Sequence, residues 1–455
     1  MPETSILLGW PLEPAIQPGR PFAASRRGNR FTDVGRATAY RRDGHLLTLA
    51  PTGAGKGVRV IIPNLLHYSG PIITVDPKGE NFAITARFRR EVLGQRIYLL
   101  DPFEAVANET LDMVGCQRGS LNPLDLLAEF TGHIEPQLTM LASMFAPDDR
   151  EGHDFWHQEA LKLLAGVIGA TVDQANARGR SPEFQGMIDM LFVDDTTYSL
   201  AELLDTQKSL GKFAYRAISA FLQKTDKERS GVMSTVHSYL TPFLSSHINT
   251  SLNSSTIRPR MILDDDDYTI YIVLPPSKLI SHSILLRIWI STLLTAIMER
   301  EAKPLKRTLF MLDECAQLGR LEALTKAVTL LRGYGLQVWM FFQDIGQLIS
   351  LYRGDHTTVI NNCEVFQAFG MTRFSAAEPV SEITGRFEPL DLVQLDKTQQ
   401  LLSLATDVPK VLRSMNYLQD PLFAGRYDGN PLFRQQEKLN PMRAPFPPNA
   451  ISIHV

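Results

Sequence analysis

The chain has 455 residues, a formal net charge of −3, 44% hydrophobic residues and 21% charged residues. These values exclude a disordered, collagen-like or miniature protein, and the length predicts two or three domains with their own cores. The near-neutral charge excludes a histone-like polycation, so any nucleic-acid contact must come from a local basic patch. The cysteines Cys116, Cys315 and Cys363 form no C-x-x-C pair. This argues against a disulfide framework or a four-thiolate zinc site and favours a reducing, cytoplasmic compartment.

Residues 1–43 are predicted to form a basic arm rich in Pro, Arg and Gly. No secretory signal is expected, because the opening residues hold four prolines and no continuous apolar core. Arginines interleaved with aromatic rings can neutralise phosphates and stack on bases, so contact with a nucleic acid or an acidic lipid is one interpretation. A solvated arm packed loosely on a neighbour is the alternative. The arginines are Arg20, Arg26, Arg27, Arg30, Arg36, Arg41 and Arg42.

Short apolar runs bounded by turn residues begin at His45. They are separated by stretches long enough for helices, which is typical of a parallel sheet in an α/β domain. The predicted strands are 45–50, 71–76, 96–101, 268–274, 308–313, 336–342 and 364–370.

Between about residues 124 and 262 the apolar residues recur at helical spacing and no convincing strand occurs. We therefore expect one α/β domain (44–123 and 263–405) interrupted by an all-helical insertion (124–262). A tail rich in Pro and Asn, predicted to be extended, follows from 406 to 455. The most apolar stretch, 281–298, is interrupted by His282 and Arg287, which favours a buried core helix over a membrane span.

The residues A-P-T-G-A-G-K-G (50–57) lie between an apolar strand and the run V-R-V-I-I-P-N-L-L, which can begin as a helix. In such a turn the backbone N–H groups cradle phosphate oxygens, the helix dipole adds to their attraction, and Lys56 reaches the β- and γ-phosphates. A nucleotide is therefore the expected ligand. The predicted nucleotide-binding residues are Pro51, Thr52, Gly53, Ala54, Gly55, Lys56 and Gly57.

This turn departs twice from the pattern G-x-x-x-x-G-K-[ST]. Ala50 replaces the first glycine, and Gly57 replaces the Ser or Thr whose hydroxyl normally binds Mg²⁺. The second departure removes a metal ligand, so water or another side chain has to fill that position.

A second half of the site is predicted where Asp313 and Glu314 end the strand T-L-F-M-L. The strand delivers the first carboxylate to Mg²⁺, and the second can polarise the attacking water. Two solvated acids are the alternative, but a phosphate loop needs such a partner on a neighbouring strand. Gln343 ends another strand, where it can sense the γ-phosphate or orient water. Arg332 lies in a Gly-rich turn and is a candidate arginine finger across a subunit interface. An ordinary strand-end glutamine and a surface arginine are the alternatives for these two.

Six segments taken together resemble a known family. From about residue 35 to about residue 405, their order is similar to that in the type IV secretion coupling proteins, the TraG-like branch of the FtsK/HerA superfamily of ring translocases. The segments are A-P-T-G-A-G-K-G, I-I-P-N-L-L (61–66), D-P-K-G-E (76–80), S-L-N-P-L-D (120–125), F-M-L-D-E (310–314) and F-F-Q-D-I-G-Q-L (341–348).

The resemblance implies an α/β fold, with a RecA-like P-loop NTPase domain and an inserted all-α domain. It implies that the active form is a homo-hexamer. A monomer in isolation is compatible with this. ATP and Mg²⁺ are the implied cofactors, with Asp313 as the magnesium ligand. The positions of Arg332 and Gln343 relative to Glu314 match the family's arginine finger and glutamine sensor. A glycine after the loop lysine, as at Gly57, is common in the family.

The implied activity is ATP-driven recruitment and translocation of DNA, with single-stranded DNA favoured, of a relaxase–DNA complex, or of effector proteins into a type IV secretion channel. Family members usually carry N-terminal membrane helices, whereas 49 residues precede Ala50 here and none is predicted to span a membrane. The expected location is therefore cytoplasmic, with peripheral attachment to the inner membrane through a partner. A DNA pump unrelated to secretion and a nucleotide-dependent recruitment adaptor with little hydrolysis stay open. DNA-stimulated turnover distinguishes the adaptor from the motors.

Three weaker signals have alternative interpretations. His153 and His157 can lie on one helix face and bind zinc, but no third ligand is evident and a polar helix start is favoured. Lys78 and Glu80 can contact the nucleotide or a neighbouring subunit. The charged residues 224–230 are either an exposed helix start that binds substrate or a solvated loop.

Overall fold

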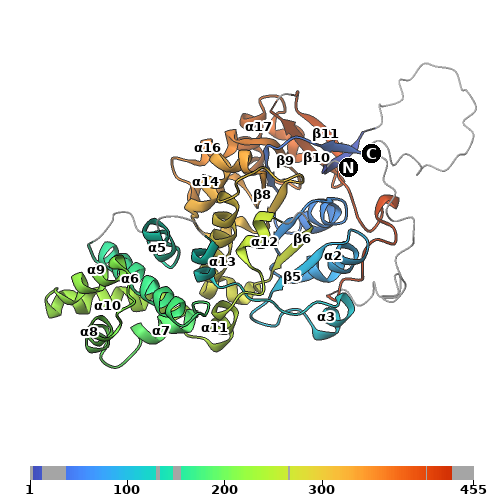
Figure 1. The fold of residues 1–455 in the computed structure, drawn as a ribbon. Helices are drawn as coiled ribbons and strands as arrows, with labels where there is room; N and C mark the ends of the chain where they lie inside the picture. Colours follow the sequence, from blue (N-terminus) through green and yellow to red (C-terminus); the bar gives the residue numbers. More distant parts are fainter. Residues whose placement is uncertain are drawn as a thin grey trace, which may run out of the picture.

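The computed structural model describes residues 4–12, 37–129, 134–146, 155–264, 267–405 and 407–432. At its centre is one eleven-stranded sheet, in the order β2-β1-β11-β10-β9-β3-β8-β7-β4-β6-β5 (Figure 1). The strands are β1 (Ile6–Pro11), β2 (Thr38–Tyr40), β3 (His45–Leu49), β4 (Ile72–Val75), β5 (Arg96–Leu100), β6 (Tyr268–Ile272), β7 (Thr308–Leu312), β8 (Leu336–Phe342), β9 (Cys363–Ala368), β10 (Gln399–Leu404) and β11 (Lys410–Arg413).

The seven neighbouring strands from β9 to β5 all run parallel. Five of them, β3, β4, β6, β7 and β8, are buried along their whole length, as expected for strands covered on both faces. These seven strands coincide with the predicted apolar runs, and the α/β class is confirmed. Because the carboxyl ends of parallel strands share one edge of a sheet, the loops that follow β3, β7 and β8 meet there.

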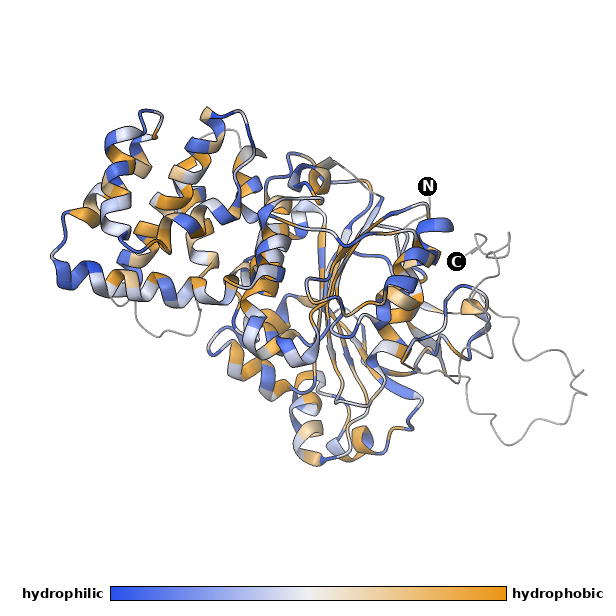
Figure 2. Cartoon of the chain, turned by 90° about the horizontal axis from the view of Figure 1, so that it is seen from below, coloured by the Kyte–Doolittle hydropathy of each residue, from blue (hydrophilic) through white to orange (hydrophobic). Residues whose placement is uncertain are grey.

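Alternate residues of β7 belong to the two layers that cover the sheet. Leu309 and Met311 share a cluster with side chains of α1 (Ile62–Leu65) and α2 (Glu80–Glu91). The intervening residues of β7 share the other cluster with α13 and α14. Figure 2 shows hydrophobic residues concentrated along the central strands. The remaining helices outside the insertion are α3 (Asn108–Val114), α13 (Pro276–Met298), α14 (Glu322–Leu330), α15 (Ile345–Leu351), α16 (His356–Asn361), α17 (Phe374–Thr384) and α18 (Pro389–Val393).

From residue 124 to residue 264, the described part of the chain forms helices and no strand, and these helices lie beside the sheet (Figure 1). The 23-residue helix α6 packs against α5, α9 and α10, and its apolar side continues the cluster that covers the α13 side of the sheet. The helices are α4 (Leu126–Glu129), α5 (Ile134–Met144), α6 (Phe155–Ala177), α7 (Phe184–Leu191), α8 (Thr196–Thr206), α9 (Lys212–Leu222), α10 (Asp226–Leu240), α11 (Ser246–Asn253) and α12 (Pro259–Asp264).

The segment after residue 406 differs from the predicted extended tail. β11 pairs with β10 on one side and β1 on the other. Beyond it, apolar residues pack on α1 and α2, and Asp428 accepts from Arg87 Nη2 at 2.6 Å. The prediction was wrong for 410–428 because the apolar residues here come in short groups of one to three between polar residues and form no recognisable run. The buried ones among them are Leu412, Met415, Tyr417, Leu422 and Phe423.

Part of the predicted N-terminal arm is also built into the sheet, where β1 pairs with β2 and β11. The buried Asn64 side chain accepts from Leu7 N at 2.7 Å and donates to Leu7 O at 3.0 Å, which fixes β1 to α1. For these strands a loosely packed arm was therefore the wrong alternative. The basic residues Arg20, Arg26, Arg27, Arg30 and Arg36 lie outside the described residues, so their contact with nucleic acid or lipid stays a prediction.

Within the described residues, only the window Ser281–Met298 of α13 is long and apolar enough to cross a membrane, and 67% of it is buried in the fold. Its Trp289 is fully buried and donates to Leu121 O at 3.1 Å. In this structure α13 is a core helix between the sheet and the all-α part, which explains its length and apolar composition.

Candidate nucleotide-binding site

The turn that follows β3 is shaped as a phosphate loop. Ala50 N donates to Phe342 O at 2.9 Å, which anchors the loop to the end of β8. Gly53 and Gly55 have φ values of +81° and +86°, a left-handed conformation that side chains disfavour. Both glycines are therefore needed for the loop to curl around an anion.

The predicted helix after the loop begins as one π-helical turn, Gly57–Ile61, and continues as α1. Pro63 explains this start, because its ring nitrogen has no hydrogen to donate to the carbonyl of Arg59, four residues earlier. The first N–H groups of this segment still point towards the loop, where an anion would sit.

Four of the predicted catalytic side chains meet at the carboxyl edge of the sheet. Lys56 Nζ donates to Glu314 Oε1 at 2.9 Å and lies 3.6 Å from Asp313 Oδ1. Gln343 Nε2 donates to Glu314 Oε2 at 3.1 Å. Lys56 lies in the loop after β3, the two acids follow β7 and Gln343 follows β8, so neighbouring parallel strands bring together residues that are far apart in the sequence.

The two acids differ in electrostatic environment. Burial raises the pKa of Asp313, and the nearby Lys56 offsets this only in part. Burial also acts on Glu314, but hydrogen bonds and attraction from Lys56 outweigh it and lower the pKa of that carboxyl. Glu314 is one of two non-glycine residues with positive φ among the described residues, at +52°. A strained backbone at a charged side chain points to a positioned functional group.

The floor of the loop is formed by the residues after β9. Phe369 N donates to Leu49 O at 3.1 Å. Gly370 has a φ of +73°, and a Cβ at this position would lie 2.6 Å from Ala54 Cβ. No sequence motif pointed to Gly370, and only the neighbouring position of β9 and β3 reveals its contact with the loop.

A third carboxyl group, Asp76, lies after β4 and close to Asp313. Burial raises the pKa of Asp76 to about 7, despite hydrogen bonds from Phe82 N and Asn81 N. Glu80 accepts from Asn430 Nδ2 at 3.3 Å, while Lys78 is exposed. The contact of Glu80 is therefore to the C-terminal segment of its own chain, and a nucleotide contact of Lys78 stays a prediction.

Arg332 does not join the other four catalytic candidates. It lies in the turn Leu331–Tyr334 before β8, whereas Gln343 follows β8. Seven strand residues separate these ends by about 20 Å. The Arg332 guanidinium donates to Asp43 at 2.9 and 2.7 Å and pairs with Glu364 at 2.6 Å. Its predicted role therefore requires the site of another subunit.

The other signals contribute less to the site. The partly buried His157 Nδ1 is 2.7 Å from Tyr239 OH in the all-α part, and His153 lies outside the described residues. Within the described residues, no three His, Cys, Asp or Glu side chains are grouped as a metal site. Cys315 and Cys363 are buried, and burial raises the pKa of both thiols.

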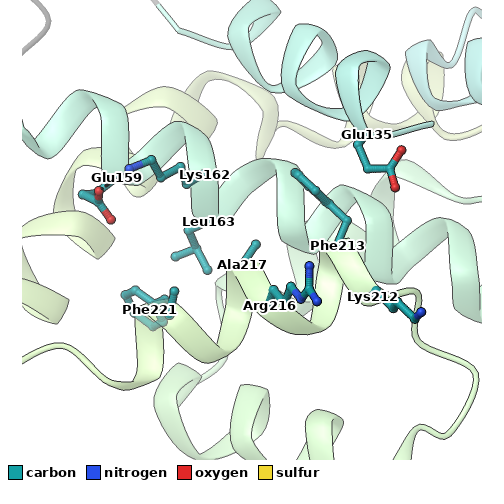
Figure 3. Close-up of a pocket in the computed structure, with 10 residues that line it drawn as sticks. Glu135, Glu159, Lys162, Leu163, Lys212, Phe213, Arg216, Ala217 and Phe221 are labelled. Atoms are coloured by element: carbon teal, nitrogen blue, oxygen red, sulfur yellow. Dashed lines mark hydrogen bonds and ion pairs between the residues drawn. The ribbon is translucent and has the colours of Figure 1, made fainter. Parts of the chain in front are cut away.

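The all-α part carries a separate cavity of about 440 Å³ between α5, α6 and α9 (Figure 3). Leu163 and Phe221 lie on its apolar wall. Charged side chains of both signs line its rim, namely Glu135, Glu159, Lys162, Lys212 and Arg216. This cavity is remote in sequence from the phosphate loop and provides a surface of its own.

A phosphate loop after one parallel strand, acids after a second and a glutamine after a third define a P-loop nucleotide-binding fold of the RecA-like kind, here with an inserted all-α domain. The family can also be stated. The chain belongs to the type IV secretory system conjugative DNA transfer family, whose model matches residues 21–388.

Curated relatives of the chain include conjugative and secretion proteins. It is 27% identical over 363 residues to the conjugal transfer protein TraG of Escherichia coli, which covers 75% of this chain and 55% of TraG. It is 23% identical over 344 residues to the type IV secretion system-coupling protein VirD4 of Bartonella quintana, which covers 75% of this chain and 53% of VirD4. The chain thus spans little more than half the length of these relatives.

Solved structures of the plasmid coupling protein TrwB share the fold. TrwB in complex with ADP and Mg²⁺ aligns with a TM-score of 0.63 and 16% identity, covering 86% of this chain and 89% of that one. TrwB in complex with a non-hydrolysable GTP analogue aligns with a TM-score of 0.64, covering 91% and 95%. This likeness supports the predicted RecA-like domain with an all-α insertion.

Proposed function

We propose that this protein is an ATP-driven coupling protein of a type IV secretion or conjugation system. The observation that carries the proposal is the convergence of Lys56, Asp313, Glu314 and Gln343 at the mouth of a phosphate loop. A fold alone does not give a function, but these four side chains supply the charge and proton acceptor that phosphoryl transfer to water requires.

In the proposed reaction the loop amides and Lys56 hold the phosphates of ATP. Glu314, whose lowered pKa keeps it ionised, accepts the proton of the attacking water. Gln343 already donates to Glu314 and is placed to position that water and to sense the γ-phosphate. Lys56 must leave the Glu314 carboxylate when phosphate binds, which frees Glu314 as a base at the moment substrate is present.

The residues present fit a magnesium ion. Asp313 is a buried carboxylate at the end of β7, and burial without a full counter-charge raises its pKa, so a cation next to it relieves an existing electrostatic cost. Gly57 offers no hydroxyl, so Asp313 is the proposed protein ligand and water completes the shell. When bound, Mg²⁺ neutralises charge that develops on the phosphates.

Arg332 is proposed to complete the site of a neighbouring subunit in a homo-hexameric ring. The support is its separation of about 20 Å from its own Gln343 together with the family's ring architecture. Asp43 and Glu364 hold the guanidinium at the opposite edge of the sheet, where it is exposed enough to contact another copy.

The proposed substrates are DNA, favoured as single-stranded, and relaxase or effector proteins, and the proposed partners are components of the secretion channel. The cavity between α5, α6 and α9 is a candidate surface for protein recruitment, because it joins an apolar wall to a charged rim. We also propose the division into an α/β domain (44–123 and 263–405), an insertion (124–262) and flanking segments. The proposed location is cytoplasmic, with peripheral attachment to the inner membrane through a partner.

The test is steady-state ATP hydrolysis with and without single-stranded DNA, for the wild type and Lys56→Ala. Losing a lysine–phosphate contact in the transition state lowers the rate by about a thousandfold. The matched control is Lys208→Ala, at an exposed lysine of the all-α part. DNA-stimulated turnover that is lost only in Lys56→Ala supports the motor. Tight ATP binding without turnover, with or without DNA, favours the recruitment adaptor instead.

A further inference from the structure

The side chain of Arg59 lies against the phosphate loop and has no hydrogen-bonding partner within the described part of the chain. Its guanidinium is 5.8 Å from the centre of the Phe369 ring, at the floor of the loop. None of its nitrogens has an acceptor among the described residues. The nearest acid that attracts it, Asp396, uses its Oδ1 to accept from the backbone and hydroxyl of Thr398. A half-buried guanidinium therefore keeps its donors available.

The position of Arg59 relative to Gly55 gives the direction of these donors. Gly55 has a φ of +86°, and the three atoms nearest to the place of its missing Cβ all belong to Arg59, with Nε at 3.3 Å. A glycine in this part of a phosphate loop leaves room for the phosphate chain to approach the backbone. The Arg59 side chain thus borders the space that the glycine keeps open.

We propose that Arg59 is a nucleotide-contacting residue that donates to the phosphates that are not transferred. Lys56 is already engaged by the two acids of β7, whereas the Arg59 side chain lies beside Gly55 and the Phe369 ring. The cation–π contact with Phe369 holds the guanidinium beside the loop, and a planar fork of donors suits phosphate oxygens. This inference rests on the proposed nucleotide site and adds a recognition residue to it.

An interaction with phosphates that do not react is equally strong in the ground state and in the transition state. Its loss therefore raises KM and leaves kcat unchanged. Arg59→Ala is expected to weaken ADP and ATP binding by the same factor, between about tenfold and a hundredfold, as for a lost charge-assisted hydrogen bond. Lys56→Ala, in contrast, lowers kcat. Arg59→Lys keeps the charge without the planar fork and recovers part of the affinity.

The experiment measures ADP and ATP affinity by calorimetry, together with kcat and KM, for the wild type, Arg59→Ala, Arg59→Lys and Phe369→Leu. Thermal unfolding without nucleotide shows whether each variant keeps the wild-type fold. An equal loss of ADP and ATP affinity at unchanged kcat and unfolding temperature, partly restored in Arg59→Lys, supports the proposal. Affinities within twofold of the wild type in both Arg59 variants, or a fall in kcat at constant KM, overturn it.

This failure differs from a failure of the proposed function. If the wild type binds ADP and Lys56→Ala abolishes turnover while Arg59→Ala changes nothing, the nucleotide site stands and only the role of Arg59 falls. If the wild type binds neither ADP nor ATP, the proposed function falls and takes the role of Arg59 with it.

Discussion

Replacing Glu314 with glutamine separates catalysis from nucleotide binding. The Glu314 carboxylate accepts from Lys56 Nζ at 2.9 Å and from Gln343 Nε2 at 3.1 Å. Glutamine keeps the size and shape of this side chain but removes its charge and its capacity to take a proton from water. The substitution therefore deletes the proposed general base without opening a cavity.

The substitution is expected to change turnover and nucleotide affinity in opposite directions. A positioned general base contributes about a hundredfold to ten-thousandfold, so turnover is expected to fall by that factor. Binding is expected to tighten, because phosphate no longer competes with Glu314 for Lys56. The two side chains are 9% and 26% exposed, which places their ion pair at the upper end of the range for surface pairs, about 1 kcal/mol. That corresponds to an ATP affinity up to about fivefold higher.

The assay combines phosphate release at saturating ATP, under conditions in which the wild type turns over, with calorimetric titration of ADP and ATP. Glu109→Gln, at an exposed carboxylate in the first turn of α3, is the control for the loss of one negative charge. Turnover of Glu314→Gln within threefold of the wild type would refute the role of Glu314 as a base. Weaker nucleotide binding would show that its contact with Lys56 helps, rather than competes with, phosphate binding.

Three further predictions concern other parts of the site. Gly370→Ala should lower ADP affinity at least about tenfold because its Cβ meets Ala54, whereas Gly354→Ala, also at positive φ but with open space around it, should leave affinity unchanged in the same titration. Arg332→Ala should leave ADP binding by the isolated chain intact but abolish turnover of the assembled ring. Mixing Arg332→Ala chains with Lys56→Ala chains should restore part of the hydrolysis, because each variant supplies the residue that the other lacks. Asp76 is protonated more readily in the folded than in the unfolded chain, since its pKa is about 7 against 3.8, so it lowers stability as pH rises from about 4 to 7. Asp76→Asn should remove this slope, at most about 1.4 kcal/mol per pH unit, in unfolding experiments across that range.

The fold was predictable where the sequence has continuous apolar runs. Five of the seven parallel strands are buried along their whole length, and such strands stand out as runs of Ile, Leu, Val and Phe between turn residues. β1, β2, β10 and β11 did not stand out, because each offers at most three consecutive apolar residues next to polar residues, glycine or proline. β1 and β11 are paired with each other although about 400 residues separate them, a partnership that no local pattern can encode.

The site was predictable where chemistry demands a fixed residue at a fixed spacing. Lys56 and the acids of β7 belong to such motifs, and the structure places them within hydrogen-bonding or ion-pair distance. Gly370 and Arg59 were missed because neither is needed by the chemistry of phosphoryl transfer itself. Gly370 leaves space beneath the loop, and Arg59 borders the loop, where we propose that it donates to phosphates.

Lys56 alone cannot neutralise the negative charge of the site. Three carboxyl groups, Asp76, Asp313 and Glu314, lie around the end of β7 and β4, and burial raises the pKa of the first two. Lys56 neutralises only one of them, and Glu314 takes most of that interaction, as its lowered pKa shows. Adding the negative phosphates of ATP to this group makes the imbalance worse unless a divalent cation enters with them. Burial, with a smaller contribution from Glu80 and Asp313, raises the pKa of Asp76 to about 7 and so favours its protonated form. In the proposed magnesium site, the surplus of carboxylate groups around Asp313 would compensate for the hydroxyl that Gly57 lacks.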